Sequence, residues 1–354
     1  MLTYHRISVL ETPLNFLILI LAASLDYLTG DHINWLHPVQ VMGWIITQFT
    51  NLVIIKNAAL NTRIPRFSPK IMKMLGFILG LGMILVCGLI SWLIVIAFSL
   101  IHPVLAIAIS SILLAACFAG RSLRDAAESV LAVLHIGNIE SARQELSRYV
   151  GRDTEDLTEL EILRAVLETV TENAIDAVTS PLFYAILGSF LFPYGCVPLA
   201  IAYKTASTLD SMVGYREPPY TDLGWFSAKT DDVLTWLPCR LTVITLALFS
   251  GKPTYVWKLC QRDAKNDPSP NSGWSECVYA AILQVQLGGE NRYRGAIKHK
   301  PLLGDDITEI SAIKIRQALK LTRTCFLLWL SLGVLIAIAQ FTLFNNLATF
   351  IPRY

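Results

Sequence analysis

LGFILGLGMILVCGLISWLIVIAFSLI, residues 75–101, decides the fold, because it runs for 27 residues without a charged side chain. About 20 such residues in a helix cross the roughly 30 Å hydrocarbon core of a bilayer. A second uncharged stretch of 20 residues occupies positions 325–344. Both stretches are predicted to be transmembrane helices, which makes this an integral membrane protein.

Two further spans are predicted near these stretches. His102 and Pro103 separate the first stretch from the uncharged residues 104–120, and a proline at this place favours a tight turn between two helices. The sequence therefore predicts a helical hairpin. Residues 14–28 give a fourth, shorter candidate that ends near Asp26, and a cleaved signal peptide is the alternative for it.

Two other apolar stretches contain residues that disfavour a simple crossing. Residues 182–203 are broken by two prolines and a glycine, which indicates a kinked or re-entrant helix. Residues 233–250 carry Arg240 near their centre, where a lone arginine costs a few kcal/mol. This segment is either short and shallow, or Asp231 or Asp232 is a distant acidic partner of Arg240.

The composition excludes several classes of protein. Of 354 residues, 54% are hydrophobic and only 16% charged, against roughly 25% charged in soluble domains. The formal net charge of +2, without a basic run, argues against nucleic-acid binding. The seven cysteines form no CxxC pair, which argues against a disulfide framework or a cysteine zinc site.

The distribution of Lys and Arg predicts the orientation of the chain in the cell (inner) membrane. Basic residues flank the predicted hairpin but are absent from its turn, so the positive-inside rule places segments 29–74, 121–180 and 251–324 in the cytoplasm. Segments 182–203 and 233–250 then either both cross the membrane or both stay on one side. The expected fold is all-α: a polytopic integral membrane helical protein with cytoplasmic helical loops, forming a single membrane domain over residues 1–354.

An acidic helix is predicted over residues 156–176. Its apolar residues follow helical spacing, and Thr158 with Glu161 forms a capping box at its start. Glu168, Glu172 and Asp176 are spaced i, i+4 and i+8, which places them on one face. This face predicts either a Mg²⁺ site, because Mg²⁺ prefers oxygen ligands, or a solvated surface in which Arg164 pairs with Glu168.

Three other polar segments are candidates for function. Asp31 and His37 follow the first apolar stretch and are either interface markers or part of a site. Segment 203–232 is densely polar between two apolar stretches. The turn 267–276 leads into a predicted helix over 274–286, which Gly288 and Gly289 are expected to end. The N–H groups at the start of this helix suit an anion, although a simple helix cap is equally consistent. The short helix 121–134 is expected to carry the surface ion pairs Arg121–Asp125 and Arg124–Glu128. The sequence contains neither a P-loop nor an HExxH or GxSxG motif.

Eight sequence blocks, in order along the chain, carry a resemblance to a known family. They are LDYLTGDHINWLHPVQVMG (25–43), GRDTEDL (151–157), ETVTENAIDAVTSPLFYAILG (168–188), YKTASTLDSMVGY (203–215), GWFSAKTDDVLTWLPCRLT (224–242), DPSPNSGWSE (267–276), VQLGGENRY (285–293) and PLLGD (301–305). The chain resembles the membrane-bound adenosylcobinamide-phosphate synthases of cobalamin biosynthesis, called CbiB or CobD. Two positions depart from the family pattern, His32 in place of a proline and Ala177 in place of a frequent glycine, and neither removes a charged group.

The resemblance implies an enzyme that depends on ATP as co-substrate and on Mg²⁺. It would join adenosylcobyric acid, a corrinoid carboxylate, to the amine of aminopropanol phosphate or a related amino alcohol. Such a site must bind Mg²⁺, shield anions and deprotonate an ammonium. Membrane lipid and other late cobalamin-pathway enzymes are the further expected partners, and the site is expected to face the cytoplasm.

Residue roles follow from residue type within these blocks. Glu168, Glu172 and Asp176 are predicted to bind the metal. Asp31 or His37 is the predicted base, and Asp231 is a further catalytic candidate that could complete the metal site. The predicted substrate and phosphate-binding residues are Arg152, Lys204, Asp210, Ser211, Arg216, Ser269, Asn271, Ser272 and Gly273.

Three other functions compete with this interpretation. An aromatic prenyltransferase would need a second acidic motif, which is not correctly spaced here. A non-catalytic membrane sensor related to AmpE would not need so many acidic residues and phosphate-type turns. A membrane transporter should place paired ionisable groups inside the membrane, whereas here they cluster at the ends of the apolar stretches.

Overall fold

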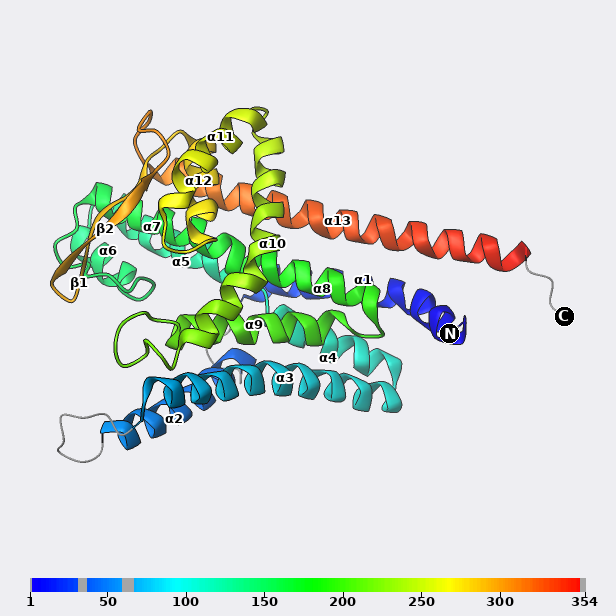
Figure 1. Ribbon diagram of the computed structural model, residues 1–354. Helices are drawn as coiled ribbons and strands as arrows, with labels where there is room; N and C mark the ends of the chain where they lie inside the picture. Colours follow the sequence, from blue (N-terminus) through cyan, green and yellow to red (C-terminus); the bar gives the residue numbers. More distant parts are fainter. Residues whose placement is uncertain (1, 31–36, 59–66, 351–354) are drawn as a thin grey trace. The chain divides into compact units, whose positions relative to one another are not determined.

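A computed structural model describes residues 2–30, 37–58 and 67–350, and over these residues the chain is mainly helical (Figure 1). The chain divides into two compact units. Unit 1 comprises residues 1–118, 181–234 and 328–354, and unit 2 comprises residues 119–180 and 235–327. Each unit is described by itself.

Unit 1 is built from long apolar helices. They are α1 (Leu2–Thr29), α2 (Pro38–Ala58), α3 (Pro69–Ile101), α4 (Pro103–Ala115) and α9 (Cys196–Val213), together with most of α8 (Ser180–Leu191). Helix α3 packs against both α4 and α9, as Figure 1 shows, and α1 packs against α4. The predicted hairpin is confirmed, because His102 is extended between α3 and α4 and its ring Nδ1 accepts a hydrogen bond from the Val104 amide at 3.2 Å.

The segment 182–203 folds as two helices joined by a turn. Helix α8 ends at Leu191 and α9 begins at Cys196, and the backbone of Tyr194 is left-handed between them. A Cβ atom on Gly188 would lie 2.1 Å from the Gly195 carbonyl oxygen, so only glycine permits this approach. The buried Asn15 amide of α1 donates to the carbonyl of Ser189 at 3.1 Å and so ties α1 to the end of α8.

Six helices in the described residues are long and apolar enough to cross a membrane, as judged by length and composition. Their stretches are Pro38–Ile55, Pro69–Ile101, Pro103–His135, Glu159–Leu191, Trp225–Phe249 and Ala312–Leu343. A shorter apolar helix covers Pro13–Thr29. The all-α, multi-pass class is therefore confirmed. The exact spans and the cytoplasmic segments remain predictions, and the segment 29–74, predicted to be cytoplasmic, contains one of the six helices.

Unit 2 begins with three helices that pack on one another. They are α5 (Gly120–His135), α6 (Ile139–Leu146) and α7 (Glu159–Ala174). The predicted capping box is present, with Thr158 and Glu161 exchanging hydrogen bonds at the start of α7. A π-helical turn, η1 (Ile175–Thr179), follows α7 directly. Because a π turn holds more residues than an α turn, the spacing that placed Asp176 on the face of Glu172 no longer applies there.

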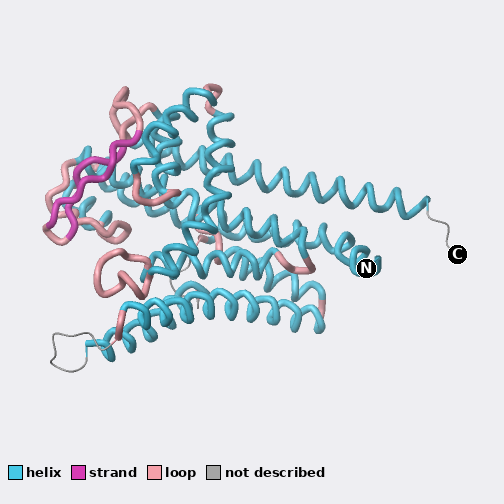
Figure 2. The backbone as a smooth tube through the Cα atoms, in the orientation of Figure 1, coloured by secondary structure: helices cyan, strands magenta, loops and turns pink. Residues whose placement is uncertain are grey.

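The rest of unit 2 includes a β-hairpin that the sequence did not predict. Helix α11 (Pro253–Asp263), the short 3₁₀ turn η2 (Ala264–Asn266) and α12 (Ser272–Leu283) lead into strands β1 (Leu287–Tyr293) and β2 (Ala296–Leu303), which pair antiparallel. Figure 2 shows the hairpin in magenta. Gly288 and Gly289, predicted to end a helix over 274–286, instead lie in β1 with φ near +90°, and α12 has already ended at Leu283. Strand β1 packs on α7 and α12.

Two long helices contribute to both units. Helix α10 (Trp225–Phe249) extends well before residue 233, where its apolar stretch was predicted to begin, and its residues from 235 on belong to unit 2. Helix α13 (Ala312–Phe350) starts in unit 2 and continues into unit 1 from residue 328. The stretch 325–344 is thus the apolar part of a longer helix whose polar start belongs to unit 2.

Candidate functional site

The polar centre of unit 2 contains a buried ion pair between α7 and the loop before it. The side chain of Glu168 is 1% exposed and that of Arg152 is 8% exposed, and their Oε2 and Nη2 atoms lie 2.5 Å apart. The second carboxylate oxygen of Glu168 accepts the amide of Gly288 on β1 at 2.9 Å, and Arg152 also donates to the Asn291 carboxamide oxygen at 2.7 Å. Each charge therefore neutralises the other, and together they attach β1 to α7.

This geometry bears on two predicted roles. Glu168 was predicted to bind a metal and Arg152 to bind phosphate, and in the structure each side chain is buried and pairs with the other. Both roles remain predictions. Arg164 was the alternative partner of Glu168, yet it donates to the carbonyl oxygens of Gly288 and Glu290, each at 2.8 Å. These contacts come from β1, which is distant in sequence. It supplies two carbonyl acceptors to Arg164 and an amide donor to Glu168, and helical spacing along α7 does not reveal them.

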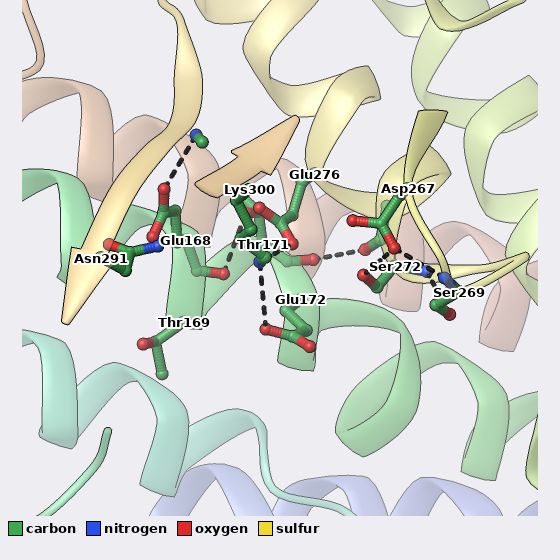
Figure 3. A network of polar contacts seen from close by, with 12 residues as sticks. Glu168, Thr169, Thr171, Glu172, Asp267, Ser269, Ser272, Glu276, Asn291 and Lys300 are labelled. Atoms are coloured by element: carbon green, nitrogen blue, oxygen red, sulfur yellow. Dashed lines mark hydrogen bonds and ion pairs between the residues drawn. The ribbon is translucent and has the colours of Figure 1, made fainter. Parts of the chain in front are cut away.

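A second charged cluster lies about one helical turn further along α7, and Figure 3 shows it at close range. The Lys300 ammonium of β2 lies 2.6 Å from Glu276 Oε1 of α12 and 4.0 Å from Glu172 Oε2 of α7. The Glu276 side chain is completely buried, whereas the Glu172 side chain is 46% exposed. Lys300 thus stands between an interior carboxylate and one that reaches solvent. We call these three residues the Lys300 cluster.

The protonation of the Lys300 cluster is set by burial and by neighbouring charges. Burial raises the pKa of the Glu276 carboxyl, the Lys300 ammonium opposes this rise, and the carboxylates of Glu172 and Glu168 add to it. Burial alone would lower the pKa of Lys300, but the same three carboxylates together raise it above its usual range. Lys300 is therefore a cation at neutral pH although its side chain is largely buried.

The cluster can be tested for its fit to Mg²⁺. Within residues 2–30, 37–58 and 67–350, no three His, Cys, Asp or Glu side chains lie close enough together to hold one metal ion. The predicted grouping of Glu168, Glu172 and Asp176 is therefore not found, because Glu168 is buried in its ion pair and Asp176 lies in the π turn. Mg²⁺ is often bound by only one or two carboxylates together with substrate phosphates. The half-exposed Glu172 fits that mode.

The first turn of α12 contacts α7, the helix that carries Glu172. The Ser275 hydroxyl donates to the carbonyl of Thr171, the neighbour of Glu172. Within the turn before α12, Asp267 accepts the Ser269 amide at 2.8 Å and the Ser269 hydroxyl oxygen accepts the Ser272 amide at 3.2 Å. The Ser269 hydroxyl oxygen also accepts the Asn271 amide, at 3.2 Å. A Cβ atom added to Gly273 would lie 2.6 Å from the Ala264 carbonyl oxygen, so the chain passes too closely there for any other residue. These bonds satisfy the amides of Ser269, Asn271 and Ser272, while the N-cap residue Asn271 makes no side-chain capping bond. The predicted role of the turn in binding phosphate remains a prediction.

Arg240 is positioned by this turn. Its guanidinium donates to the carbonyl of Pro270 at 2.8 Å and lies over the rings of Trp274 and Trp236, 4.4 Å and 5.4 Å from their centroids. These contacts of Arg240 are to a backbone carbonyl and two indole rings, and its pairing with Asp231 or Asp232 remains a prediction. The Oδ2 atom of Asp232 lies 3.3 Å from Lys229 Nζ in an ion pair. A cation in an apolar helix is here stabilised by a backbone carbonyl and by aromatic faces.

The ion pairs predicted on α5 are half confirmed. Arg121 pairs with Asp125 at 2.5 Å, as predicted. Arg124 also contacts Asp125, at 3.5 Å, whereas the predicted partner Glu128 forms two hydrogen bonds with Arg316 of α13, each at 2.8 Å. Arg316, from a distant helix that spacing along α5 could not indicate, supplies the hydrogen bonds to Glu128, and Arg124 acts on Glu128 as a nearby positive charge.

The remaining predicted residues belong to unit 1 or lie outside the described residues. Asp31 is outside them. His37 immediately precedes α2, and Asp231 lies on α10. Lys204, Asp210 and Ser211 lie on α9, where the Ser211 hydroxyl donates to the Thr208 carbonyl at 3.0 Å, and Arg216 follows in the next loop. Their predicted roles remain predictions.

Sequence reasoning missed Glu276, Lys300 and Asn291 as site residues. Glu276 ends the block DPSPNSGWSE, Asn291 lies in the block VQLGGENRY, and Lys300 directly precedes PLLGD. The sequence blocks therefore contained the signal for two of them. Their partners could not be identified, because the pairing depends on how the hairpin folds back on α7 and α12.

Comparisons with known proteins agree with one another. A family model described as "CobD/Cbib protein" matches residues 19–322. A cobalamin biosynthesis protein CobD from Synechocystis is 53% identical over 319 residues, which cover 90% of each chain. A CobD protein from Halalkalibacterium halodurans is 38% identical over 87% of this chain and 94% of its own length, and a cobalamin biosynthesis protein CbiB from Salmonella typhimurium is 36% identical over 90% and 95%. No solved structure matches the chain.

Proposed function

Because this chain belongs to the CobD/CbiB family of cobalamin biosynthesis proteins, we propose that it is an ATP-dependent carboxylate–amine ligase. Its acid substrate is adenosylcobyric acid and its amine substrate is aminopropanol phosphate or a related amino alcohol. The product is adenosylcobinamide phosphate. The proposal places the site at the cytoplasmic side of the inner membrane, where ATP is available, with membrane lipid around the helices and other late cobalamin-pathway enzymes as partners.

The Lys300 cluster is the observation that supports this chemistry best. A carboxylate reacts with an amine only after activation, and ATP provides an acyl phosphate or an acyl adenylate. Both routes crowd negative charge, which a fixed cation in a partly buried site neutralises far better than bulk water does. Lys300 is such a cation, and the half-exposed Glu172 beside it can bind a metal-bearing phosphate.

The proposal assigns a separate chemical role to each of these residues. Glu172 would hold Mg²⁺, which would supply charge neutralisation at the phosphate oxygens. Lys300 donates hydrogen bonds to the phosphate that leaves as the amide bond forms. The ammonium of the amine must lose a proton before its nitrogen attacks the activated carboxyl, and Asp31 or His37 remains the proposed base for that proton.

The test uses detergent-purified protein with adenosylcobyric acid, aminopropanol phosphate, ATP and Mg²⁺. Corrinoid mass and nucleotide products are followed together. Amide formation coupled to ATP loss is expected, and ADP or AMP as the product identifies the acyl phosphate or the acyl adenylate. A folded protein that forms no amide overturns the proposal.

A variant pair tests the assignment of Glu172. Glu172→Gln removes the charge at the half-exposed position, and it is expected to raise the Mg²⁺ concentration needed for half-maximal rate. Glu155→Gln is the matched control, because Glu155 is exposed in the loop before α7. An unchanged Mg²⁺ requirement in Glu172→Gln removes the metal assignment.

A further inference from the structure

Two features of the Lys300 cluster are costly for a structural ion pair. Glu276 is fully buried, and while its Oε1 receives Lys300 at 2.6 Å, its Oε2 is buried without a hydrogen-bond partner. A buried ion pair stabilises a fold only when its geometry is good and its remaining acceptors are satisfied. This pair leaves an acceptor unsatisfied, so stability alone does not account for it.

The two acids beside Lys300 also differ in their exposure to solvent. The buried Glu276 holds Lys300 from the interior side, and the Lys300 side chain keeps 25% of its surface exposed. On the other side stands Glu172, 4.0 Å away and half-exposed. The ammonium of Lys300 is therefore held at the boundary between the interior and the solvent. A lysine on a strand of a hairpin otherwise has four flexible bonds and no fixed position.

The backbone around the cluster fixes where its side chains start. Lys300 is the register partner of Gly289 on β1. Glu276 and Glu172 come from α12 and α7, which are joined next to the cluster by the hydrogen bond from Ser275 to Thr171. Three elements that are distant in sequence thus fix one ammonium group.

We propose that Glu276 is a positioning residue, which holds the Lys300 ammonium beside Glu172, and that Lys300 is the catalytic residue that stabilises the leaving phosphate during amide formation. This inference rests on the proposed ligase function and adds to it the residue that positions Lys300, the phosphate-stabilising group. Glu276 acts only through Lys300.

A double-mutant cycle on the full-length protein in detergent tests this dependence. Lys300→Met is expected to lower kcat by about 100-fold with a small change in KM, as the loss of one preorganised charge stabiliser does. Glu276→Gln keeps the shape of the side chain and is expected to lower kcat by about 10-fold. The combined variant Glu276→Gln with Lys300→Met is expected to lose no more kcat than Lys300→Met alone, because the two residues act in series.

Three further variants separate chemistry from folding. Lys300→Arg is expected to restore part of the kcat that Lys300→Met loses. Lys298→Met is the matched control, since Lys298 lies on the same strand over the ring of Tyr293, and its kcat is expected to be unchanged. The apolar pair Glu276→Leu with Lys300→Met is expected to unfold at or above the wild-type temperature while remaining inactive.

The outcomes distinguish the two proposals. A wild-type protein without amide product overturns both the ligase function and the role of Lys300. An active wild type together with a fully active Lys300→Met variant overturns the role of Lys300 alone. Losses of kcat that multiply in the double variant overturn the serial role of Glu276, and so does an apolar pair that no longer folds.

Discussion

Removing Arg152 is expected to destabilise unit 2 strongly, because it leaves Glu168 as a buried charge. With 2.5 Å between the two charged atoms, their attraction is about 7 kcal/mol at an effective dielectric constant of about 20. Desolvation offsets much of this attraction, and the measured cost of removing one partner of a buried pair is about 3–5 kcal/mol. Arg152→Met should therefore lower the free energy of unfolding by about this amount.

The assay is thermal unfolding followed by tryptophan fluorescence in detergent, in parallel with ligase activity. Arg152→Met is expected to lower the Tm by on the order of 10 °C. Glu168→Gln should cost less, because its amide oxygen can still accept the hydrogen bond from Gly288. At a temperature where it is folded, Glu168→Gln should keep the wild-type dependence on Mg²⁺.

Two results would refute this reasoning. An Arg152→Met variant with the wild-type Tm would show that the pair does not stabilise unit 2. A folded Glu168→Gln variant with a greatly increased Mg²⁺ requirement would show that Glu168 binds the metal, as its spacing in the sequence first suggested. Arg148→Met serves as the control, because the Arg148 side chain is 69% exposed and its ion pair should contribute little.

Three further outcomes are expected from other parts of the chain. Asn15→Leu removes the donor to Ser189 and should cost about 1 kcal/mol of unfolding free energy, measured as a lower Tm; no change would exclude this bond as a tie between α1 and α8. Gly188→Ala places a Cβ 2.1 Å from the Gly195 carbonyl and should cost at least about 1–3 kcal/mol, seen as reduced yield of folded protein, with Gly82→Ala, which meets nothing within 4 Å, as the control. Burial raises the pKa of Asp263, but hydrogen bonds from Arg262 and from the Gly304 amide together bring this pKa below its usual range. The Asp263 carboxylate therefore stabilises the fold above about pH 4, and this contribution is lost as the pH falls through the lower pKa of the folded state. The Tm of Asp263→Asn should therefore lie below that of the wild type at pH 7 and approach it below pH 4; a constant difference would contradict the assignment.

The parts of the fold that local sequence determines could be predicted. Thr158 and Glu161 are three residues apart and form their capping box as expected, and the His102–Pro103 turn needs only its own helix ends. Apolar length alone located most of the long helices. The β-hairpin was missed because Gly288 and Gly289 also read as a helix stop, and their positive φ angles become meaningful only once β2 pairs with them.

The candidate site was predictable in its elements but not in its pairings. Glu172 was predicted from its helix face, and its side chain reaches solvent in the structure. Glu168 looked equivalent on that face, yet Arg152 and the hairpin enclose it completely. Helical spacing describes the position of a side chain on its own helix and says nothing of which distant segment covers it.

The position of Arg240 has a consequence for the order in which the protein is made. Its guanidinium is stabilised by the Pro270 carbonyl, just before α12, and by the Trp274 ring in the first turn of α12, both synthesised after α10 is complete. Until they emerge, Arg240 in a newly made α10 has the Trp236 ring of its own helix beside it but lacks these two contacts. A lone arginine in an apolar helix costs about 2.5–3.5 kcal/mol on insertion scales. Pro270 follows Arg240 by 30 residues, so the final environment of this arginine forms only after the start of α12 has been synthesised.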